Sequence, residues 1–390
     1  MGLTLYFGVH SLASQRLFLI SKDRSVRDAG RSNVANVRTG IEKLKASSLL
    51  KYETSNGKDS GTLIRKEVAF AIADNNGGSI MERRYWIEQS DLSGGRRTEL
   101  VSSDETHDVR IKTLWWNSYN SLYEIIDQPN LVIVANKFLI PKEFLPEQNQ
   151  LSLAYRSPKG RYANVVFVPY SPDIHSRDLV DAGRTYINES IDGAFEDLQK
   201  RGVRSLDRPE MLVVNVTSVD LIRTILLVEH IDYFSFAFAD DDGLTLAQRV
   251  LVLVGANQEW AYRYTNSPAG ANGLAQFIAS TYEIIRKAYP SAGLIRDYKL
   301  GMADHVNAVK AMVLFLDYHR KILRQGIGSS VAARMGISDQ MLAATYNGGA
   351  NGVISAVASS GTGWTVSERL ALETRRYLEK YDKIKSLNLF

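Results

Sequence analysis

The run LTLAQRVLVLVGANQEW, residues 244–260, constrains the fold of this chain more than any other segment. Apolar residues fall on nearly every side of a helix drawn through it, so little polar face remains to meet water. A helix of this kind is stable when other helices surround it. The run therefore predicts a helical domain in which residues 244–260 form a central element.

The segments on both sides of this run have the apolar spacing of helices that bury one face. The first of them stops at Gly202, a residue that commonly ends helices. Another begins at the cap-like pair Ser338 and Asp339 and is broken by YNGGANG. Helices are expected at 174–202, 218–231, 304–319, from 338 to that break, and at 366–384.

Residues 1–173 have a different pattern, with β-rich runs such as LVIVANKFLI at 131–140 and ANVVFVPY at 163–170. The acidic, glycine-ended ADDDG at 239–243 is the preferred domain boundary. We therefore expect an α+β protein with three parts. These are a mixed α/β domain at 1–173, a helical connecting segment at 174–240 and an all-α domain at 241–390.

Length and charge agree with more than one domain. A chain of 390 residues exceeds what one compact core usually holds. Residues 244–390 contain 17 Lys and Arg against 10 Asp and Glu, whereas the preceding residues contain 30 against 33. A cationic C-terminal part suits an anionic polymer, which can be nucleic acid, a membrane face or bacterial cell wall.

Several classes of chemistry are excluded by residue content. The chain has no cysteine, so disulfides, thiolate catalysis and Cys-bound zinc are ruled out. The six histidines are scattered without ligand spacing, and no phosphate-binding glycine loop is present. We therefore expect neither a metal nor a cofactor.

The N-terminal residues 1–20 allow two interpretations. They are apolar and contain the small-residue stretch SLAS, as a cleavable export signal does. No positive residue precedes the apolar part, and His10, Gln15 and Arg16 interrupt it, which suits a buried strand equally well. A membrane-spanning helix is not expected, and membrane association stays open.

Four short motifs follow one another in the C-terminal part: QEW from Gln258, SPAGANGLAQF from Ser267, TYNGG from Thr345 and ETRRY from Glu373. In this order they resemble the soluble lytic transglycosylases, lysozyme-like enzymes that cut bacterial peptidoglycan. The resemblance covers residues 244–385. It implies a lysozyme-like helical fold, peptidoglycan glycan strands as the substrate, no cofactor and an extracytoplasmic location in the periplasm or cell envelope.

The resemblance makes Glu259 the catalytic acid. A carboxyl group at the end of a buried helix loses water, which raises its pKa, and Trp260, Tyr262 or Phe277 would supply apolar walls. The acid protonates the glycosidic oxygen. In this family the N-acetyl group of the sugar stabilises the intermediate and its 6-hydroxyl attacks. The same Glu then takes the hydroxyl proton and leaves a 1,6-anhydromuramoyl end.

Other motif residues are expected to bind the sugar through hydroxyl, amide, carboxylate or aromatic groups. Each also has a structural interpretation, with Gln276 as a turn cap, Tyr346 and Tyr377 as core residues and Glu373 as a surface ion-pair partner. The expected substrate-binding residues are Ser267, Gln276, Phe277, Tyr346, Asn347, Glu373 and Tyr377.

The chain departs from the family pattern at three positions. Trp260 replaces the usual Ser after the acid, which removes a hydroxyl and adds an indole. Ala275 replaces Met, and Gly348 replaces Ala. The last two changes alter bulk without touching a proton-transfer group, so we expect them to affect substrate fit.

Three alternative functions remain. A hydrolytic goose-type lysozyme would need a second acid, for which Asp297 and Asp304 are the nearby candidates. A non-catalytic peptidoglycan-binding envelope protein would bind cell wall without cutting it. A nucleic-acid binder is not expected, because a segment such as GLAQFIASTYEIIRKAYP is far more often an ordinary amphipathic core helix than part of a helix-turn-helix. Residues 1–240 could recruit a cell-envelope protein partner.

Overall fold

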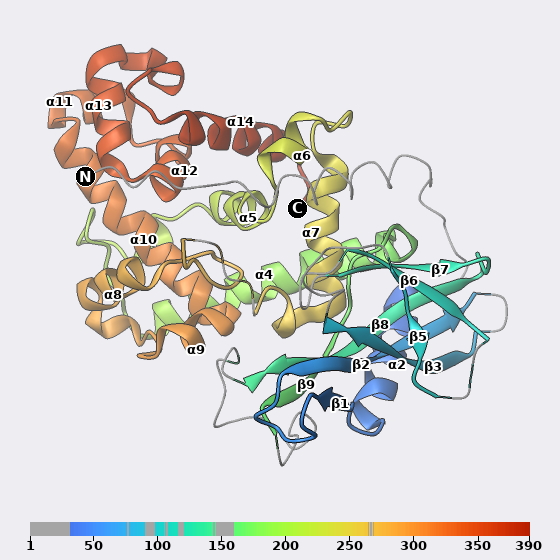
Figure 1. Cartoon of the computed structure of the whole chain (residues 1–390). Coiled ribbons are helices and arrows are strands. Elements are labelled where there is room, and N and C mark those ends of the chain that lie inside the picture. The colour runs from blue at the N-terminus through green and yellow to red at the C-terminus, as the bar shows by residue number, and fades with distance from the viewer. Residues whose placement is uncertain are drawn as a thin grey trace. The chain divides into compact units, whose positions relative to one another are not determined.

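The computed structural model combines helices with antiparallel strands, which confirms the α+β class (Figure 1). The alternatives raised for residues 1–20 lie outside the described part of the chain. The structure describes residues 32–75, 78–89, 98–104, 106, 108–115, 121–142, 145, 160–263, 265, 267 and 269–390. Among these residues no helix is both long and apolar enough to cross a membrane.

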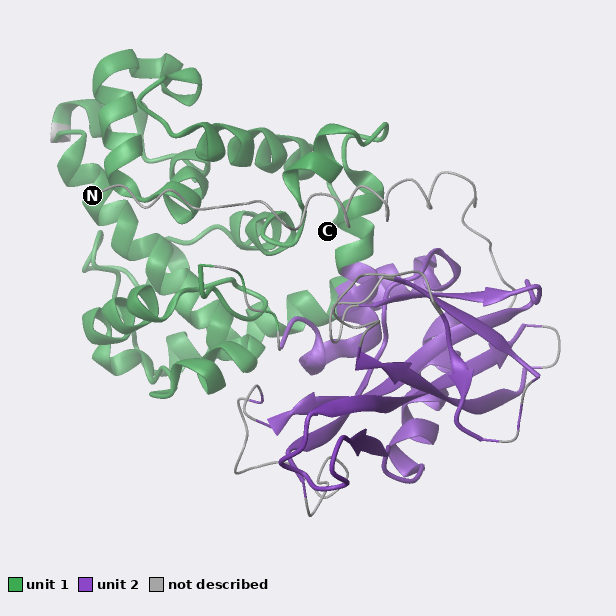
Figure 2. Ribbon diagram, in the orientation of Figure 1, with its two compact units in different colours: residues 1–19, 184–250, 265–390 green, residues 20–183, 251–264 purple. Residues whose placement is uncertain are grey.

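The chain divides into two compact units (Figure 2). The described part of unit 1 is Arg184–Val250 and Thr265–Phe390, and unit 2 falls within Ile20–Gly183 and Leu251–Tyr264. This division differs from the expected boundaries after residues 173 and 240. Most of the expected connecting segment belongs to the helical unit, and residues 251–264 belong with the strands.

Close packing of two helices inside unit 2 explains the second difference. α4 (Arg177–Lys200) and α7 (Leu244–Asn257) each contribute one end to this unit. A Cβ on Gly183 would lie 2.0 Å from the Leu251 carbonyl oxygen. These helices therefore touch backbone to backbone, which only a glycine allows, and this contact ties the end of α7 to unit 2.

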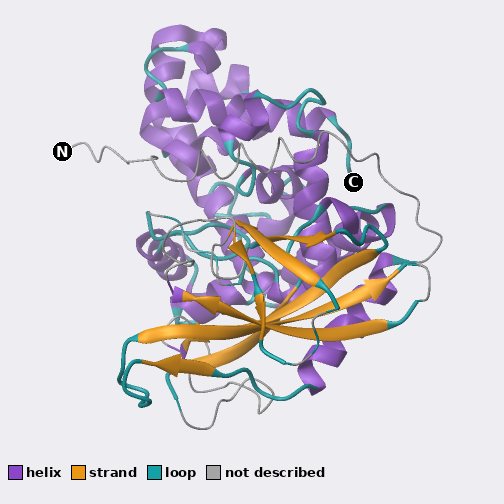
Figure 3. Ribbon diagram, turned by 45° about the vertical axis from the view of Figure 1, so that its right-hand side comes forward, coloured by secondary structure: helices purple, strands orange, loops and turns teal. Residues whose placement is uncertain are grey.

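Unit 2 contains two antiparallel sheets (Figure 3). In the larger sheet the order is β5-β3-β2-β8-β9, and β1 pairs with β2. Its strands are β1 (Tyr52–Thr54), β2 (Leu63–Asp74), β3 (Ile80–Glu88), β5 (Val101–Ser102), β8 (Leu131–Pro141) and β9 (Tyr162–Phe167). The smaller sheet has the order β4-β6-β7, formed by Thr98–Glu99, Arg110–Trp115 and Leu122–Ile126.

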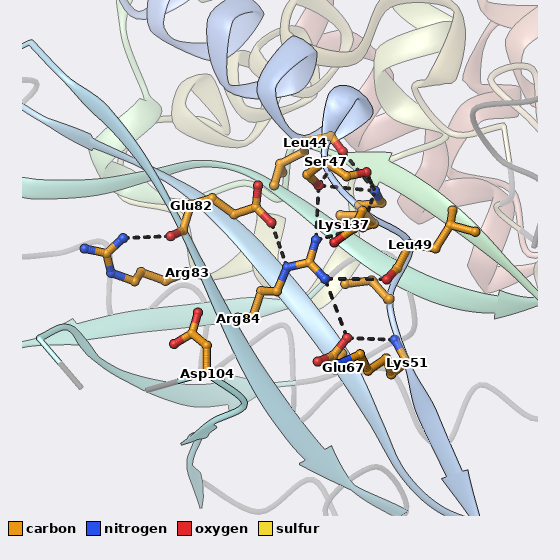
Figure 4. A network of polar contacts seen from close by, with 12 residues as sticks. Leu44, Ser47, Leu49, Lys51, Glu67, Glu82, Arg83, Arg84, Asp104 and Lys137 are labelled. Carbon is orange, nitrogen blue, oxygen red and sulfur yellow. Dashed lines mark hydrogen bonds and ion pairs between the residues drawn. The ribbon is translucent and has the colours of Figure 1, made fainter. Parts of the chain in front are cut away.

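Helix α2 (Asn33–Ala46) packs on the larger sheet, and a buried lysine caps its C-terminal end (Figure 4). Lys137 on β8 is 1% exposed. Its Nζ donates to the carbonyl oxygens of Leu44, Ser47 and Ser48 at 3.0, 3.0 and 3.1 Å. These are carbonyls that a helix cannot satisfy internally. Burial lowers the pKa of Lys137 to about 8.

An arginine completes this cluster (Figure 4). Arg84 on β3 donates to the Ser48 carbonyl oxygen at 2.7 Å and to Oε1 of Glu82 at 2.8 Å. It also lies 3.7 Å from Oε2 of the buried Glu67, which accepts from the Lys51 backbone N–H at 2.7 Å. Both carboxylates of the cluster are therefore paired with an arginine.

Unit 1 is helical. α10 (His305–Gly326) is its most enclosed helix, because every residue from Asn307 to Asp317 is buried. The expected central element, α7, is fully buried from Val250 to its end and mostly half-buried before that, and it is shared with unit 2. The other helices are α5 (Val219–Val228), α6 (Tyr233–Ala237), α8 (Ala279–Ala288), α9 (Tyr298–Ala303), α11 (Ser329–Met335), α12 (Asp339–Gly348), α13 (Ala350–Ser360) and α14 (Leu372–Ser386).

Most expected helices form within a few residues of their predicted bounds. The Ser338 hydroxyl accepts from the Met341 N–H at 3.2 Å, so the predicted N-cap of α12 is confirmed. The last helix begins later than expected, at Leu372, after the 3₁₀ turn η7 (Gly361–Val366).

Candidate active site

Helix α5 places a carboxyl group at its C-terminal end. The residues from Leu221 to Val228 are buried apart from Arg223, and Glu229 follows as the C-cap. The Glu229 backbone N–H still donates to the carbonyl oxygens of Ile225 and Leu227. Glu229 as a residue is half-buried, and its carboxyl group is shielded from water. An apolar helix thus ends in one desolvated acid.

The environment of Glu229 favours its protonated form. Loss of water raises its pKa to about 7, and the charge of Glu373 adds to this effect. The Tyr377 hydroxyl, which donates to Oε1 at 2.7 Å, and the Lys380 ammonium both act in the opposite direction. The partial negative charge at a helix C-terminus also disfavours a carboxylate there. Glu229 therefore holds a proton close to neutral pH.

The GLAQF motif lies beside this acid. The carbonyl oxygen of Leu274 lies 2.8 Å from Nε2 of His230, and because a carbonyl only accepts, the imidazole donates. Burial lowers the pKa of His230 to about 4, so the ring is neutral at pH 7. The Tyr346 hydroxyl on α12 donates to the Ala275 carbonyl oxygen at 2.5 Å. Hydrogen bonds thus hold the motif against His230, the residue after Glu229, and against α12.

Backbone requirements shape the turn within this motif. Gly273 has φ 72°, and a Cβ there would lie 2.3 Å from the Met302 carbonyl oxygen. Gln276 has φ 48°, and its Nε2 donates to the Gly273 carbonyl oxygen at 2.6 Å. The structural interpretation of Gln276 as a turn cap therefore holds in this structure. A sugar would have to displace this hydrogen bond to reach the amide.

Two further expected substrate-binding residues have structural roles. The Ser267 hydroxyl accepts from the Ala271 N–H at 3.0 Å and closes a local turn. Phe277 is 4% exposed, and its ring makes edge contacts with Phe315 and Tyr346, with centroids 5.6 and 5.7 Å apart. The prediction that Phe277 contacts substrate is therefore wrong, because its ring lies in the helical core.

Asn347 and Glu373 remain accessible. Asn347 is partly exposed near the end of α12, and Glu373 is exposed in the first turn of α14. Tyr377 lies one turn after Glu373 and is 4% exposed, which agrees with its interpretation as a core residue, while its binding to substrate stays a prediction. It is a core residue whose hydroxyl reaches the acid.

Glu259 does not have the environment that the sequence predicts. It lies in the 3₁₀ turn η5 (Gln258–Trp260) after α7, where its side chain is exposed. The prediction of a desolvated carboxyl group is therefore wrong. The Trp260 ring lies under the Arg263 guanidinium, 5.0 Å from its centroid. Residues 251–264 belong to unit 2, whereas the other three motifs belong to unit 1.

The candidate second acids for a lysozyme cap helices instead. Asp297 accepts from the Leu300 N–H at 2.9 Å at the start of α9. Asp304 accepts from the Asn307 N–H at 2.8 Å at the start of α10. Both side chains are exposed. The carboxyl group whose charge acts on Glu229 is that of Glu373.

Two departures from the family pattern affect packing. Ala275 is fully buried, and a Cβ on Gly348 would lie 2.2 Å from Oγ1 of Thr374 on α14. The smaller residue at 348 therefore brings α12 close to α14. The expected effect of these two positions on substrate fit finds no support in these contacts.

The comparisons with family models, with curated proteins and with solved structures found no match for this chain. Within the described ranges, no group of three or more His, Cys, Asp and Glu side chains is placed to hold a metal ion. The functional argument therefore rests on the residues around Glu229.

Proposed function

We propose that this chain cleaves the glycosidic bond between N-acetylmuramic acid and N-acetylglucosamine in peptidoglycan without hydrolysis, with Glu229 as general acid and then general base. The observation that carries the proposal is the desolvated carboxyl group at the end of α5, whose pKa is raised to about 7 and which accepts a hydrogen bond from the tyrosine of the ETRRY motif. A general acid works best when its pKa lies near the working pH.

Glu229 replaces Glu259 in this proposal because the chemistry needs a carboxyl group that is still protonated when it meets the glycosidic oxygen. Glu259 is exposed, whereas the carboxyl group of Glu229 is shielded from water. The motif residues Tyr346 and Tyr377 also belong to the same unit as Glu229. Their contacts place the GLAQF turn and α14 around this acid.

The reaction needs a single carboxyl group. Glu229 gives its proton to the glycosidic oxygen as the bond between that oxygen and the anomeric carbon breaks. The N-acetyl group of the sugar stabilises the anomeric carbon, as the resemblance to lytic transglycosylases implies. Glu229, now a carboxylate that accepts from Tyr377, takes the proton of the sugar 6-hydroxyl. The 6-oxygen bonds to the anomeric carbon, and a 1,6-anhydromuramoyl end results.

Neighbouring side chains supply binding groups for the glycan. Asn347 and Glu373 offer an amide and a carboxylate that are accessible to solvent. Tyr346 is partly exposed and presents an aromatic edge to this region. Tyr377 orients Glu229 and strengthens the carboxylate form during the second step.

Hydrolysis is the second candidate function, because Glu373 is a carboxyl group close enough to act on Glu229 electrostatically. In a lysozyme such a group would activate water or act as a nucleophile. Glu373→Gln distinguishes the two mechanisms. It should leave anhydro products unchanged for a transglycosylase and should abolish reducing ends for a lysozyme.

The test is digestion of purified sacculi, followed by mass spectrometry of the soluble muropeptides. The proposal expects products that carry 1,6-anhydromuramoyl ends. Products with reducing ends would support hydrolysis. Binding to sacculi without soluble products would support a non-catalytic wall-binding protein.

The substrate implies an extracytoplasmic location for this activity. Unit 2 lacks the motif residues apart from QEW, so we assign it a role other than bond cleavage. Recruitment of a cell-envelope protein through this unit is the proposal that fits a peptidoglycan enzyme. The test uses the Glu229→Gln chain, with unit 2 unchanged, as bait in a pull-down of envelope proteins. Capture of a partner by this variant would show that recruitment does not depend on catalysis.

A further inference from the structure

A buried lysine lies beside the acid and has no place in the reaction steps above. Lys380 is on α14, three residues after Tyr377, so the two side chains share one face of the helix. Its side chain is 8% exposed. Nζ donates to the carbonyl oxygens of Val228 and Ile231 at 3.1 and 2.6 Å.

These two carbonyls flank Glu229 in the chain. A helix leaves its last carbonyls without internal partners, and a cation is favourable at that end. Lys380 supplies the charge and a donor to the last carbonyl of α5, that of Val228, which also accepts from the Ile231 N–H, and to the Ile231 carbonyl beyond the helix. It therefore fixes the backbone on either side of the acid, which limits where the Glu229 side chain can point.

The same ammonium acts on the groups that bond to Glu229. Nζ lies 5.5 Å from the centroid of the Tyr377 ring, within the range of a cation–π contact. A nearby cation makes a phenol a stronger hydrogen-bond donor, and Tyr377 donates to Glu229. Lys380 thus favours the carboxylate form of Glu229 directly and through Tyr377.

We infer that Lys380 is a positioning residue of this site: it fixes the end of α5 and favours the carboxylate that Glu229 must become between its acid and base steps. The inference rests on the proposed function. A transglycosylase has no second carboxylate to act as the base, so the carboxyl group that gave up its proton must stay ionised until the 6-hydroxyl arrives.

Other charged and titratable groups also affect the pKa values of Lys380 and Glu229. Burial lowers the pKa of Lys380 to about 8, while Glu229, Asp232 and Glu373 act to raise it. The ammonium is therefore charged at the pH where Glu229 titrates. The groups that act on this pair are His230 and Asp232 after α5, Tyr346 on α12, and Glu373 and Tyr377 on α14; His305 on α10 acts on His230.

The test measures the charge state of Glu229 directly in the full chain. Carboxyl ¹³C shifts of glutamate-labelled protein are followed against pH, and Glu229→Gln identifies the Glu229 signal. Lys380→Met should raise the pKa of Glu229 by about one unit, because it removes an opposite charge close by. Lys380→Arg should restore most of the original value. Lys380→Gln, whose amide still donates, replaces Lys380→Met if that variant does not fold, with the same expected shift.

Lys383→Met is the matched control. Lys383 lies one turn further along α14, is 49% exposed and pairs with Asp242. This variant should leave the Glu229 signal unchanged. A purely structural Lys380 would lower the stability of the variants and leave the pKa of Glu229 where it was, which would overturn the inference.

Digestion of sacculi by the same variants separates the two proposals. If both hold, the alkaline limb of the release profile of Lys380→Met moves up by about one pH unit together with the carboxyl signal. If the Glu229 carboxyl signal shifts in Lys380→Met but the native chain releases no muropeptides, the proposed function is overturned and the effect of Lys380 on Glu229 stands. Release of muropeptides with an unshifted signal would overturn the role of Lys380 alone.

Discussion

Lys137 in unit 2 and Lys380 in unit 1 occupy equivalent local settings, yet only one lies beside a group able to do chemistry. Each is a buried lysine whose Nζ caps the C-terminal carbonyls of a helix, and burial lowers the pKa of each to about 8. The two clusters differ in their carboxyl groups. Glu67, beside Lys137, accepts from a backbone N–H and pairs with Arg84.

Glu229, beside Lys380, has weaker partners. Its hydrogen-bond donor is a tyrosine hydroxyl, and burial raises its pKa to about 7. A carboxylate paired with an arginine stays ionised and has a structural role. A carboxyl group that is shielded from water and bonded only to a hydroxyl can hold a proton. The comparison shows that a buried lysine at a helix C-terminus has a structural role in both units. The hydrogen-bond and ion-pair partners of the neighbouring carboxyl group decide whether that group can hold a proton.

The largest expected effect on stability comes from Lys137→Met. This change removes a donor from all three carbonyl oxygens at the α2 end. Leu44 keeps the Ser47 hydroxyl and Ser48 keeps Arg84 as donors, so the Ser47 carbonyl loses most, and the protein should be destabilised by about 3 kcal/mol. Urea unfolding followed by strand-sensitive circular dichroism measures it. Lys43→Met, on the exposed face of the same turn, should stay within about 0.5 kcal/mol of the native protein. Equal losses in both variants would contradict the capping role.

Glu229→Gln should stabilise the chain, by an amount that depends on pH. The pKa of Glu229 is higher in the folded than in the unfolded protein, so the folded state binds more protons between pH 4.5 and 7. Stability from this group is present below pH 4.5 and is lost as pH rises through 7. The neutral amide avoids this loss, for a gain on the order of 2 kcal/mol at pH 8.

The measurement is the urea midpoint of both proteins at pH 4.5 and at pH 8. The gain of Glu229→Gln should appear only at the higher pH. A gain of equal size at both values would mean that the carboxyl group is not desolvated in the folded protein. Glu67→Gln is the counterpart in unit 2 and should destabilise the protein, because it weakens a paired carboxylate.

A smaller effect is expected for Tyr377→Phe. Removal of the hydroxyl takes away the donor to Glu229, so the pKa of Glu229 should rise and muropeptide release should fall on the order of tenfold. Tyr381→Phe is the matched control one turn further along α14. Its buried hydroxyl has no hydrogen-bond partner among the described residues, so release should be unchanged. Similar losses in the two variants would show that α14 contributes only packing.

Helix periodicity was enough to predict much of the fold. Apolar spacing and caps predict the runs that form α4, α10 and α12, because both signals are local in the sequence. The division into units was not predictable in the same way. It depends on a close approach of two helices at Gly183, and nothing in the local pattern distinguishes that glycine from others.

The candidate site was predicted in part. The motifs identified Tyr346 and Tyr377, whose contacts lie around the acid, but Glu229 was missed. The family spacing places the acid about ten residues before the SPAGA stretch, and here α6 and α7 lie between Glu229 and that stretch. The physical criterion applied to Glu259, a carboxyl group at the end of an apolar helix, fits LLVEHI equally well. An acid at the end of an apolar run can therefore be recognised at Glu229 without the family's motif spacing.

The central claim is that Glu229, and not Glu259, supplies the proton for glycan cleavage. Release of soluble muropeptides from purified sacculi should be compared for the native chain, Glu229→Gln and Glu259→Gln at equal concentrations and at the pH optimum of the native chain. We predict a loss of about a thousandfold or more for Glu229→Gln and native release for Glu259→Gln. Native release by Glu229→Gln, with loss of release by Glu259→Gln, would contradict the account.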